Sequence, residues 1–221
     1  SFKDQLDHAM LALETSYGLG YLLLIYLALK KLSLKEVYLE KIYTVTENVA
    51  RESQRIQHNE LLVKGETYTL YELLQLVLLT QRSDAILALA EALFETTNHA
   101  LQEIRHQATA LGIDAGKILN VSGRIYRQTK QYKTLYDIYK IIESMKDFPK
   151  RILNLLDVKI WVFKSKLIQF EELFRQVEFD YYTLTVGKGK EKIYVVFNNE
   201  NLGLFSAEPE SVYMEYDIPY I

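Results

Sequence analysis

Residues 62–91 read LVKGETYTLYELLQLVLLTQRSDAILALAE, and this stretch decides the fold that the sequence predicts. It begins as a short strand, and the Lys64-Gly65 pair that follows favours a turn. Thr69 is suited to cap a helix, because Glu72 stands three residues later and completes a capping box. The pattern therefore predicts a strand, a turn and a helix over Leu70–Leu79.

A second helix follows after a break at Gln81–Ser83. Its apolar residues run over Ala85–Phe94, and Ser83 or Asp84 is positioned to cap it. Two apolar helices joined by a short polar break predict a helical hairpin that buries most of its surface.

The most apolar window of the chain lies upstream, at Leu19–Leu29, with the sequence LGYLLLIYLAL. The glycines within Ser16–Gly20 favour a turn, and a helix is predicted over Tyr21–Lys31. Because this helix is apolar on nearly all sides and too short to cross a membrane, we expect it to be buried in the middle of a domain.

Downstream of residues 62–91, the sequence first continues with helices. A third helix is predicted from a cap at Thr97 or Asn98 to Leu111, where Gly112 stops it. A loop at Ile118–Gly123 and an amphipathic helix at Thr134–Met145 come next.

The last third of the chain favours strands. Aromatic and β-branched residues predict strands at Ile160–Phe163, Tyr181–Val186 and Lys192–Phe197, with a hairpin turn at Gly187–Lys190. Helices followed by strands indicate an α+β fold, with an antiparallel sheet packed against a helical block and a buried central helix. We predict one domain over 1–221, with its helical block at about 47–150 and its sheet drawn from about 9–14 and 158–200.

Composition limits the classes of function. The chain has 221 residues, a formal net charge of -3 and no cysteine, which argues against nucleic-acid partners, disulfides and cysteine-ligated metals. His99 and His106 stand on a similar helix face, but a solvated face is a better interpretation than a metal pair, which prefers an i, i+4 spacing. We expect neither a metal nor a cofactor.

Three stretches together resemble the serine D-alanyl-D-alanine carboxypeptidases, the low-molecular-weight penicillin-binding proteins. The apolar helix and the segment YTVTENVA resemble the family's first helix and its V-T-x-S-x-x-A segment. Residues 62–91 resemble G-x-x-Y-T-V-E-D-L-L followed by S-G-N-D-A-A-x-A-L-A-E. Residues 108–123, ATALGIDAGKILNVSG, resemble A-x-x-L-G-M followed by F-x-N-x-x-G-L. The resemblance implies a β-lactamase/transpeptidase-like fold.

The same resemblance places the family's catalytic motifs on residues that lack their chemistry. The Ser-x-x-Lys motif, which supplies a nucleophile and the lysine that activates it, falls on Gly18 and Tyr21. The Ser-x-Asn motif falls on Gln81, Arg82 and Ser83. Neither Ser-x-x-Lys nor Lys-Thr-Gly occurs anywhere in the sequence.

Several residues are candidates for lining the remnant cleft. Tyr17, Arg82 and Ser122 are the polar or aromatic candidates, and Tyr21 and Tyr26 are weighed with them. Arg82 either holds an anionic ligand or is an exposed arginine of a turn. The tyrosines either line a groove or pack in the core, as aromatic residues usually do.

The resemblance implies a non-catalytic binding or scaffolding module at the extracellular face of a bacterial membrane or in the cell wall. Its expected partners are a peptidoglycan peptide or a cell-envelope protein, and a segment outside this chain could anchor it to a membrane. The alternative is an active hydrolase of peptidoglycan stem peptides with a rearranged site. A third hypothesis is an unrelated α+β protein.

Overall fold

The computed structural model describes residues 19–56, 61–122, 135–156, 160–163, 166–169, 182–186, 193–198, 202–206 and 212–216. The strand predicted at 9–14, the turn at Gly187–Lys190, and the residues Tyr17 and Gly18 lie outside this part of the chain.

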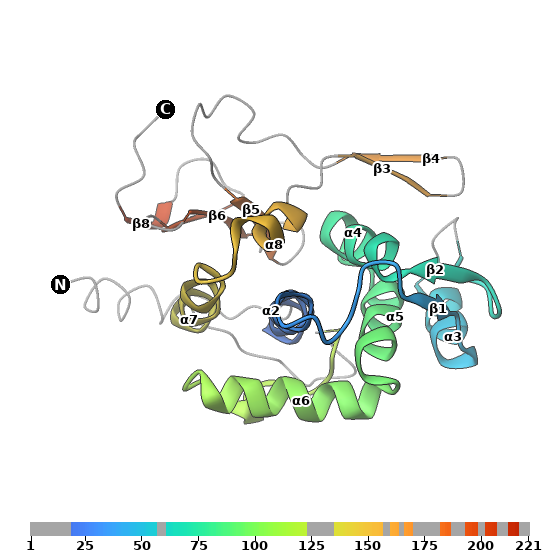
Figure 1. Cartoon of the computed structure of the whole chain (residues 1–221). Coiled ribbons are helices and arrows are strands. Elements are labelled where there is room, and N and C mark those ends of the chain that lie inside the picture. Colours follow the sequence, from blue (N-terminus) through green and yellow to red (C-terminus); the bar gives the residue numbers. More distant parts are fainter. Residues whose placement is uncertain are drawn as a thin grey trace.

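A single helix, α2 (Leu19–Ser33), occupies the middle of the molecule. In Figure 1 it is seen end-on, with α6 (Thr97–Ala110), α7 (Leu135–Met145) and α5 (Ser83–Phe94) around it. These helices all contact α2. The predicted buried central helix is therefore confirmed.

Composition explains why α2 is central. Every residue from Leu19 to Leu29 is buried, and Leu24 at its middle is 0% exposed. Charge appears only in the last turn, at Lys30 and Lys31, where lysines interact favourably with the negative end of the helix dipole. A helix without a polar face is stable only when neighbours cover all of its sides.

The helical hairpin comprises α4 (Leu70–Thr80) and α5, and the predicted capping box is present. Thr69 Oγ1 accepts from the backbone N–H of Glu72 at 3.1 Å, and the Glu72 carboxylate accepts from the N–H of Thr69 at 2.7 Å. The predicted cap of α5 was wrong, because the cap position is Arg82 and Ser83 is already helical.

The remaining helices complete a helical block. They are α3 (Glu47–Arg55), the four-residue α8 (Lys150–Leu153), and the 3₁₀ turns η1 (Ala115–Lys117) and η2 (Asn154–Leu156). The cap of α6 is Thr96, so the predicted cap at Thr97 or Asn98 was one or two residues too late. Gly112 follows the end of α6 with a φ of +70°, as expected for a glycine that stops a helix.

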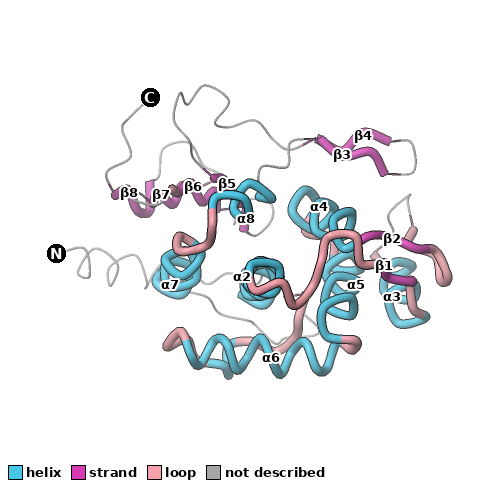
Figure 2. Tube along the Cα trace, viewed as in Figure 1, coloured by secondary structure: helices cyan, strands magenta, loops and turns pink. Residues whose placement is uncertain are grey.

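The strands form small antiparallel sheets, coloured magenta in Figure 2. The first pairs β1 (Ile42–Thr44) with β2 (Thr67–Thr69), so the strand predicted before the Lys64-Gly65 turn in fact follows it. The second pairs β3 (Ile160–Phe163) with β4 (Lys166–Gln169).

The largest described sheet has the order β5-β6-β7-β8. It contains β5 (Tyr182–Val186), β6 (Ile193–Phe197), β7 (Leu202–Ser206) and β8 (Val212–Tyr216). The antiparallel pairing of β5 with β6 confirms two predicted strands. The predicted end of the sheet near residue 200 was too early, because β7 and β8 continue the same sheet.

These elements establish an α+β architecture in which α2 is enclosed by helices, with the four-stranded sheet at one side (Figure 1). Within the described residues, we find no helix with both the length and the apolar character needed to cross a membrane.

Candidate functional site

The first turn of α2, where the sequence places the first motif, packs against the loop that precedes Gly123. A Cβ atom added to Gly20 would lie 2.7 Å from the carbonyl oxygen of Asn120 and 2.9 Å from that of Val121. Only a residue without a side chain allows this close approach of helix and loop. Gly20 lies inside α2, so the predicted turn does not extend to it.

The same contact brings the loop of Ser122 to α2. Ser122 is buried, and its hydroxyl donates to Oδ1 of Asn120 at 3.2 Å. The structure thus brings together two regions that the sequence analysis treated separately: the start of α2 and the loop that contains Ser122.

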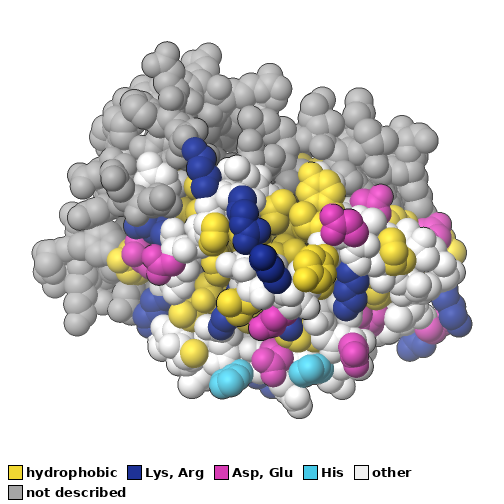
Figure 3. Space-filling view, in the orientation of Figure 1, with side chains coloured by type: hydrophobic (Ala, Val, Ile, Leu, Met, Phe, Trp, Pro, Cys, Tyr) yellow, Lys and Arg dark blue, Asp and Glu magenta, His cyan; other side chains and the backbone are white. Residues whose placement is uncertain are grey.

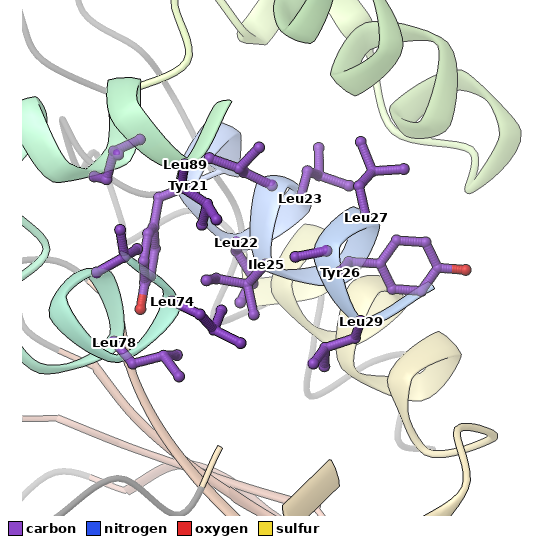
Figure 4. Packing of buried hydrophobic residues seen from close by; sticks show 14 of the residues in the cluster. Tyr21, Leu22, Leu23, Ile25, Tyr26, Leu27, Leu29, Leu74, Leu78 and Leu89 are labelled. Carbon is purple, nitrogen blue, oxygen red and sulfur yellow. The ribbon is translucent and has the colours of Figure 1, made fainter. Parts of the chain in front are cut away.

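Tyr21, at the position predicted for the family's activating lysine, is part of the hydrophobic core. It is 1% exposed, and its hydroxyl has no hydrogen-bond partner among the described residues. In Figure 4 the ring extends from α2 toward Leu74 and Leu78 of α4. Burial raises the pKa of the Tyr21 hydroxyl above its ordinary value, so the neutral phenol is strongly favoured.

Tyr26 does not share the surroundings of Tyr21. Figure 4 shows the two rings pointing to different sides of α2. The ring of Tyr26 packs on Phe148, with 5.4 Å between the ring centroids. Burial, followed by the nearby charge of Asp147, raises the pKa of Tyr26. Tyr21 and Tyr26 therefore pack in the core, which was one of the two interpretations of the sequence; the other placed them in a groove.

The second motif falls on the turn between α4 and α5. Gln81 ends α4 in the left-handed region, with φ 48° and ψ 30°. Arg82 is 4% exposed, which excludes the interpretation as an exposed turn arginine. Its Nε donates to Oδ1 of Asp84 at 3.0 Å, and a terminal nitrogen donates to Oδ2 at 2.6 Å.

This two-pronged pair explains why Arg82 is poorly suited to hold an anionic ligand. Asp84 is 0% exposed and also accepts from the backbone N–H of Ala85 at 2.8 Å. Breaking a buried, bidentate ion pair is costly, because each charge would be left without its partner. A ligand anion would have to compete with a carboxylate that the fold already supplies.

Ser83 is likewise engaged inside the fold. Its hydroxyl donates to Oε1 of Glu52 at 2.7 Å, and Glu52 comes from α3 and is 4% exposed. The contact therefore fastens α3 to the start of α5. No hydrogen bond joins Tyr21 to Ser83, so within the described residues these two motif positions have no direct polar contact. Gly18, the other position of the first motif, lies outside the described residues.

Sequence reasoning missed two buried glutamates, Glu52 and Glu91. Glu91 on α5 is 8% exposed and accepts from the hydroxyl of Tyr43 at 2.7 Å, from Thr46 Oγ1 at 2.8 Å and from Asn48 Nδ2 at 3.0 Å. A signal was present for Glu91, which stands among the apolar residues of α5, where a charged residue needs internal partners. The mostly polar sequence of α3 gave no such signal for Glu52.

The polar side chains at the predicted second motif are engaged within the fold. Acyl transfer needs a nucleophile within hydrogen-bond reach of a base, and here the polar groups of the second motif donate to or pair with acidic residues. In the described part of the chain, no group of three or more acidic, histidine or cysteine side chains is arranged to hold a metal ion.

A family model described as D-alanyl-D-alanine carboxypeptidase matches residues 19–180. This match spans well over half of the chain. The chain belongs to the D-alanyl-D-alanine carboxypeptidase family. The family resemblance expected from the sequence is thereby confirmed, and the hypothesis of an unrelated α+β protein was wrong.

Solved structures of the family share the fold. Penicillin-binding protein 6B of Escherichia coli superposes with a TM-score of 0.68 at 13% identity, over 86% of this chain and 60% of that one. Penicillin-binding protein 3 of Streptococcus pneumoniae gives 0.63 at 16% identity, over 83% of this chain and 60% of that one. A D-alanyl-D-alanine carboxypeptidase of Mycobacterium tuberculosis gives 0.59 at 19% identity, over 81% and 67%.

At these identities the likeness shows the fold alone. The chain spans 60% of the length of the first two structures. A search of curated proteins gave no match. The β-lactamase/transpeptidase-like fold is established, and the activity is a separate question.

Proposed function

We propose that this chain is a non-catalytic member of the carboxypeptidase family that acts as a binding or scaffolding module. The observation that carries the proposal is the state of Tyr21. At the position of the activating lysine stands a phenol that is 1% exposed, has no hydrogen-bond partner among the described residues and has a raised pKa. Such a group does not accept a proton at neutral pH.

The identity of residue 18 supports the same conclusion. Glycine stands where the family has its serine, so the nucleophile and the base are lost together. The nucleophile and its base act together in acyl transfer, so restoring only one of them should not restore the reaction. Lys-Thr-Gly, which contacts the substrate carboxylate in the family, is also missing from the sequence.

The second motif adds a further argument. The Arg82 side chain is bound to Asp84 at the start of α5, and the Ser83 side chain joins α5 to Glu52 of α3. In the family these positions face the substrate. Here a substrate peptide would have to displace one buried and one partly buried polar contact before it reached the turn.

The family suggests where such a module works. We propose the extracellular face of a bacterial membrane or the cell wall as its location, with a peptidoglycan peptide or a cell-envelope protein as its partner. The modest net charge of -3 is compatible with either partner and disfavours nucleic acid.

Labelling with a fluorescent penicillin tests the proposal. We expect no covalent, boiling-resistant label on this chain, while a penicillin-binding protein such as 6B of E. coli serves as the positive control. Label on this chain would instead support the alternative of an active hydrolase with a rearranged site. The labelled residue, located by peptide mapping, would then identify its nucleophile.

A further inference from the structure

The chain passes from α5 into α6 through only two residues, Glu95 and Thr96. The backbone of Glu95 has φ 69° and ψ -38°, a conformation that residues with a side chain rarely adopt. Across it, the N–H of Thr96 donates to the carbonyl oxygen of Phe94 at 2.8 Å, which is the hydrogen bond of a γ-turn. A γ-turn with positive φ is strained, and Glu95 is exposed, so packing of its own side chain does little to offset that strain.

The side chain of His99, in the first turn of α6, holds this turn in place. Its Nδ1 lies 2.9 Å from the carbonyl oxygen of Phe94, and because a carbonyl only accepts hydrogen bonds, Nδ1 carries the proton and donates. The His99 ring also packs edge-on against the Phe94 ring, with 5.7 Å between the centroids. The backbone N–H of His99 donates to Thr96 Oγ1 at 3.1 Å. One residue therefore contacts both neighbours of Glu95.

Beyond this turn, α6 buries little apolar surface of its own. Its buried residues are Ala100, Ile104 and Ala108, which are four residues apart and share one face, and Leu101 is partly buried beside them. An alanine methyl group removes far less apolar surface from water than a leucine side chain does. The outer face is polar, since Figure 3 shows histidine and acidic side chains at the lower edge, where α6 lies in Figure 1.

Hydrogen bonds at the partly exposed rim fasten the second half of α6. Lys30 Nζ of α2 donates to Oε1 of Gln107 at 3.1 Å, and Arg105 Nε donates to the carbonyl oxygen of Ile118 at 2.9 Å. Beside the first of these contacts, α6 and the C-terminal end of α2 border an open groove of about 410 Å³. Each hydrogen bond of this kind adds only modestly to stability. The helix is therefore held by a narrow apolar stripe and a few polar contacts.

We propose that α6 is a hinged lid over one side of α2, with the strained turn at Glu95 as its hinge and His99 as its latch. Strained backbone persists only where its surroundings hold it, and it is concentrated at switch regions. Helices with few buried apolar contacts open more readily than the core, and lids are drawn from such elements. The inference concerns a motion of the fold and does not depend on whether the chain is catalytic.

Opening of the lid would relax the turn and uncover an apolar side of α2. Figure 4 shows Leu23 and Leu27 extending toward the side of α2 on which α6 lies, and the two helices are in contact. Both leucines are buried when α6 is closed. The closed lid therefore hides apolar surface, and the Glu95 turn and the His99 contact control how often it is exposed.

Native-state hydrogen exchange, followed residue by residue by NMR on the whole chain, tests the inference. After correction for intrinsic rates, we expect the amides of Ile104 and Ala108 to exchange about tenfold or more faster than those of Leu24 and Ile25. This difference would show that α6 opens while α2 remains folded. Exchange of the two helices at one common rate would instead mean that α6 opens only when the whole domain unfolds, and would overturn the inference.

Changes at the hinge separate strain from charge. Glu95→Gly removes the strain, because glycine adopts positive φ without steric cost, so exchange of the α6 amides should slow by about threefold or more. Glu95→Ala is the matched control, because it removes the same carboxylate but keeps the Cβ atom that causes the strain. Its exchange should stay within about twofold of the unmutated chain. Equal effects of the two variants would contradict a strained hinge.

Changes at the latch test the role of His99. His99→Phe keeps an aromatic ring beside Phe94 but removes the Nδ1 donor, so the α6 amides should exchange roughly three- to tenfold faster while those of α2 are unchanged. His106→Phe makes the same substitution at an exposed site of the same helix and should change exchange by less than about twofold. If His99→Phe leaves the exchange of α6 unchanged, His99 is not a latch and the proposal fails.

Discussion

The two ends of α2 differ in how they meet their surroundings. At its N-terminal end, Gly20 contacts backbone carbonyls and Tyr21 is 1% exposed. At its C-terminal end, Lys30 is half-buried and Leu34, just beyond the helix, is 58% exposed in a groove. The N-terminal end of α2 is closed by this packing, and its C-terminal end is open.

This difference bears on the proposed non-catalytic function, because the fold does not need the motif positions for its stability. Apolar residues along α2 supply the burial that stabilises the domain, and this does not depend on the motif positions. The polar groups at the predicted second motif likewise hold helices together, as in the contact from Ser83 to Glu52.

The largest expected effect comes from placing a charge in the middle of α2. Leu24→Asp puts a carboxylate at a site that is 0% exposed, and an unpaired buried charge should cost several kcal/mol and prevent folding. The measurement is thermal unfolding followed by circular dichroism. Leu34→Asp, the same change at the open end, should alter the free energy of unfolding by about 0.5 kcal/mol or less. A cooperative, stable Leu24→Asp variant would refute the placement of α2.

A smaller effect is expected at the closed end. Gly20→Ala should lower the free energy of unfolding by about 1–3 kcal/mol, because its new methyl group would lie 2.7 Å from a backbone oxygen that cannot easily move. Urea denaturation measures the change. The control is Gly116→Ala, where the nearest atom, at 3.1 Å, belongs to the side chain of Asp114 in an exposed turn. Equal losses in the two variants would contradict the close packing of α2 on the loop.

Two buried tyrosines should respond oppositely to the loss of a hydroxyl. Tyr43→Phe removes a donor to the buried Glu91 and should destabilise by about 1–3 kcal/mol. Tyr21→Phe removes a hydroxyl that has no partner among the described residues, so it should be neutral or stabilising. Urea denaturation of both variants at pH 7 compares them directly. A marked loss of stability in Tyr21→Phe would show that its hydroxyl is bonded.

Alkaline pH should sharpen the same contrast. Burial raises the pKa of Tyr21 in the folded state, so its contribution to stability is fully present below its ordinary pKa of about 10. That contribution is lost as pH rises toward the raised folded value, by up to about 1.4 kcal/mol per pH unit. Tyr21→Phe should therefore resist unfolding above about pH 10 better than the unmutated chain. Tyr38→Phe, at a site 63% exposed, should follow the unmutated profile.

The sequence predicted those features that depend on local pattern. The capping box at Thr69 and Glu72 is local, and so is the apolar run of α2; both were confirmed. The cap of α5 was misplaced by one or two residues because Ser83, a good cap by type, donates instead to Glu52 on another helix. The contacts of Gly20 and Arg82 could not be predicted, because they depend on segments brought together only by the fold.

Strands were the least predictable elements. The short β4, β7 and β8 have weak individual patterns and are fixed by pairing with their neighbours. The sequence itself, by contrast, shows that the patterns Ser-x-x-Lys and Lys-Thr-Gly do not occur in it. The assignment of Gly18 and Tyr21 to motif positions remains a prediction.

Intact-mass spectrometry after incubation with penicillin tests the central claim that the closed end of α2 has no acyl-enzyme chemistry. Because Gly18 supplies no nucleophile and Tyr21 supplies no base, we predict that the mass of the native chain is unchanged. We predict the same for Gly18→Ser alone, because no base would activate the new serine. Gly18→Ser combined with Tyr21→Lys is the variant in which slow acylation is conceivable. A mass increase equal to one penicillin molecule on the unmutated chain would contradict the account.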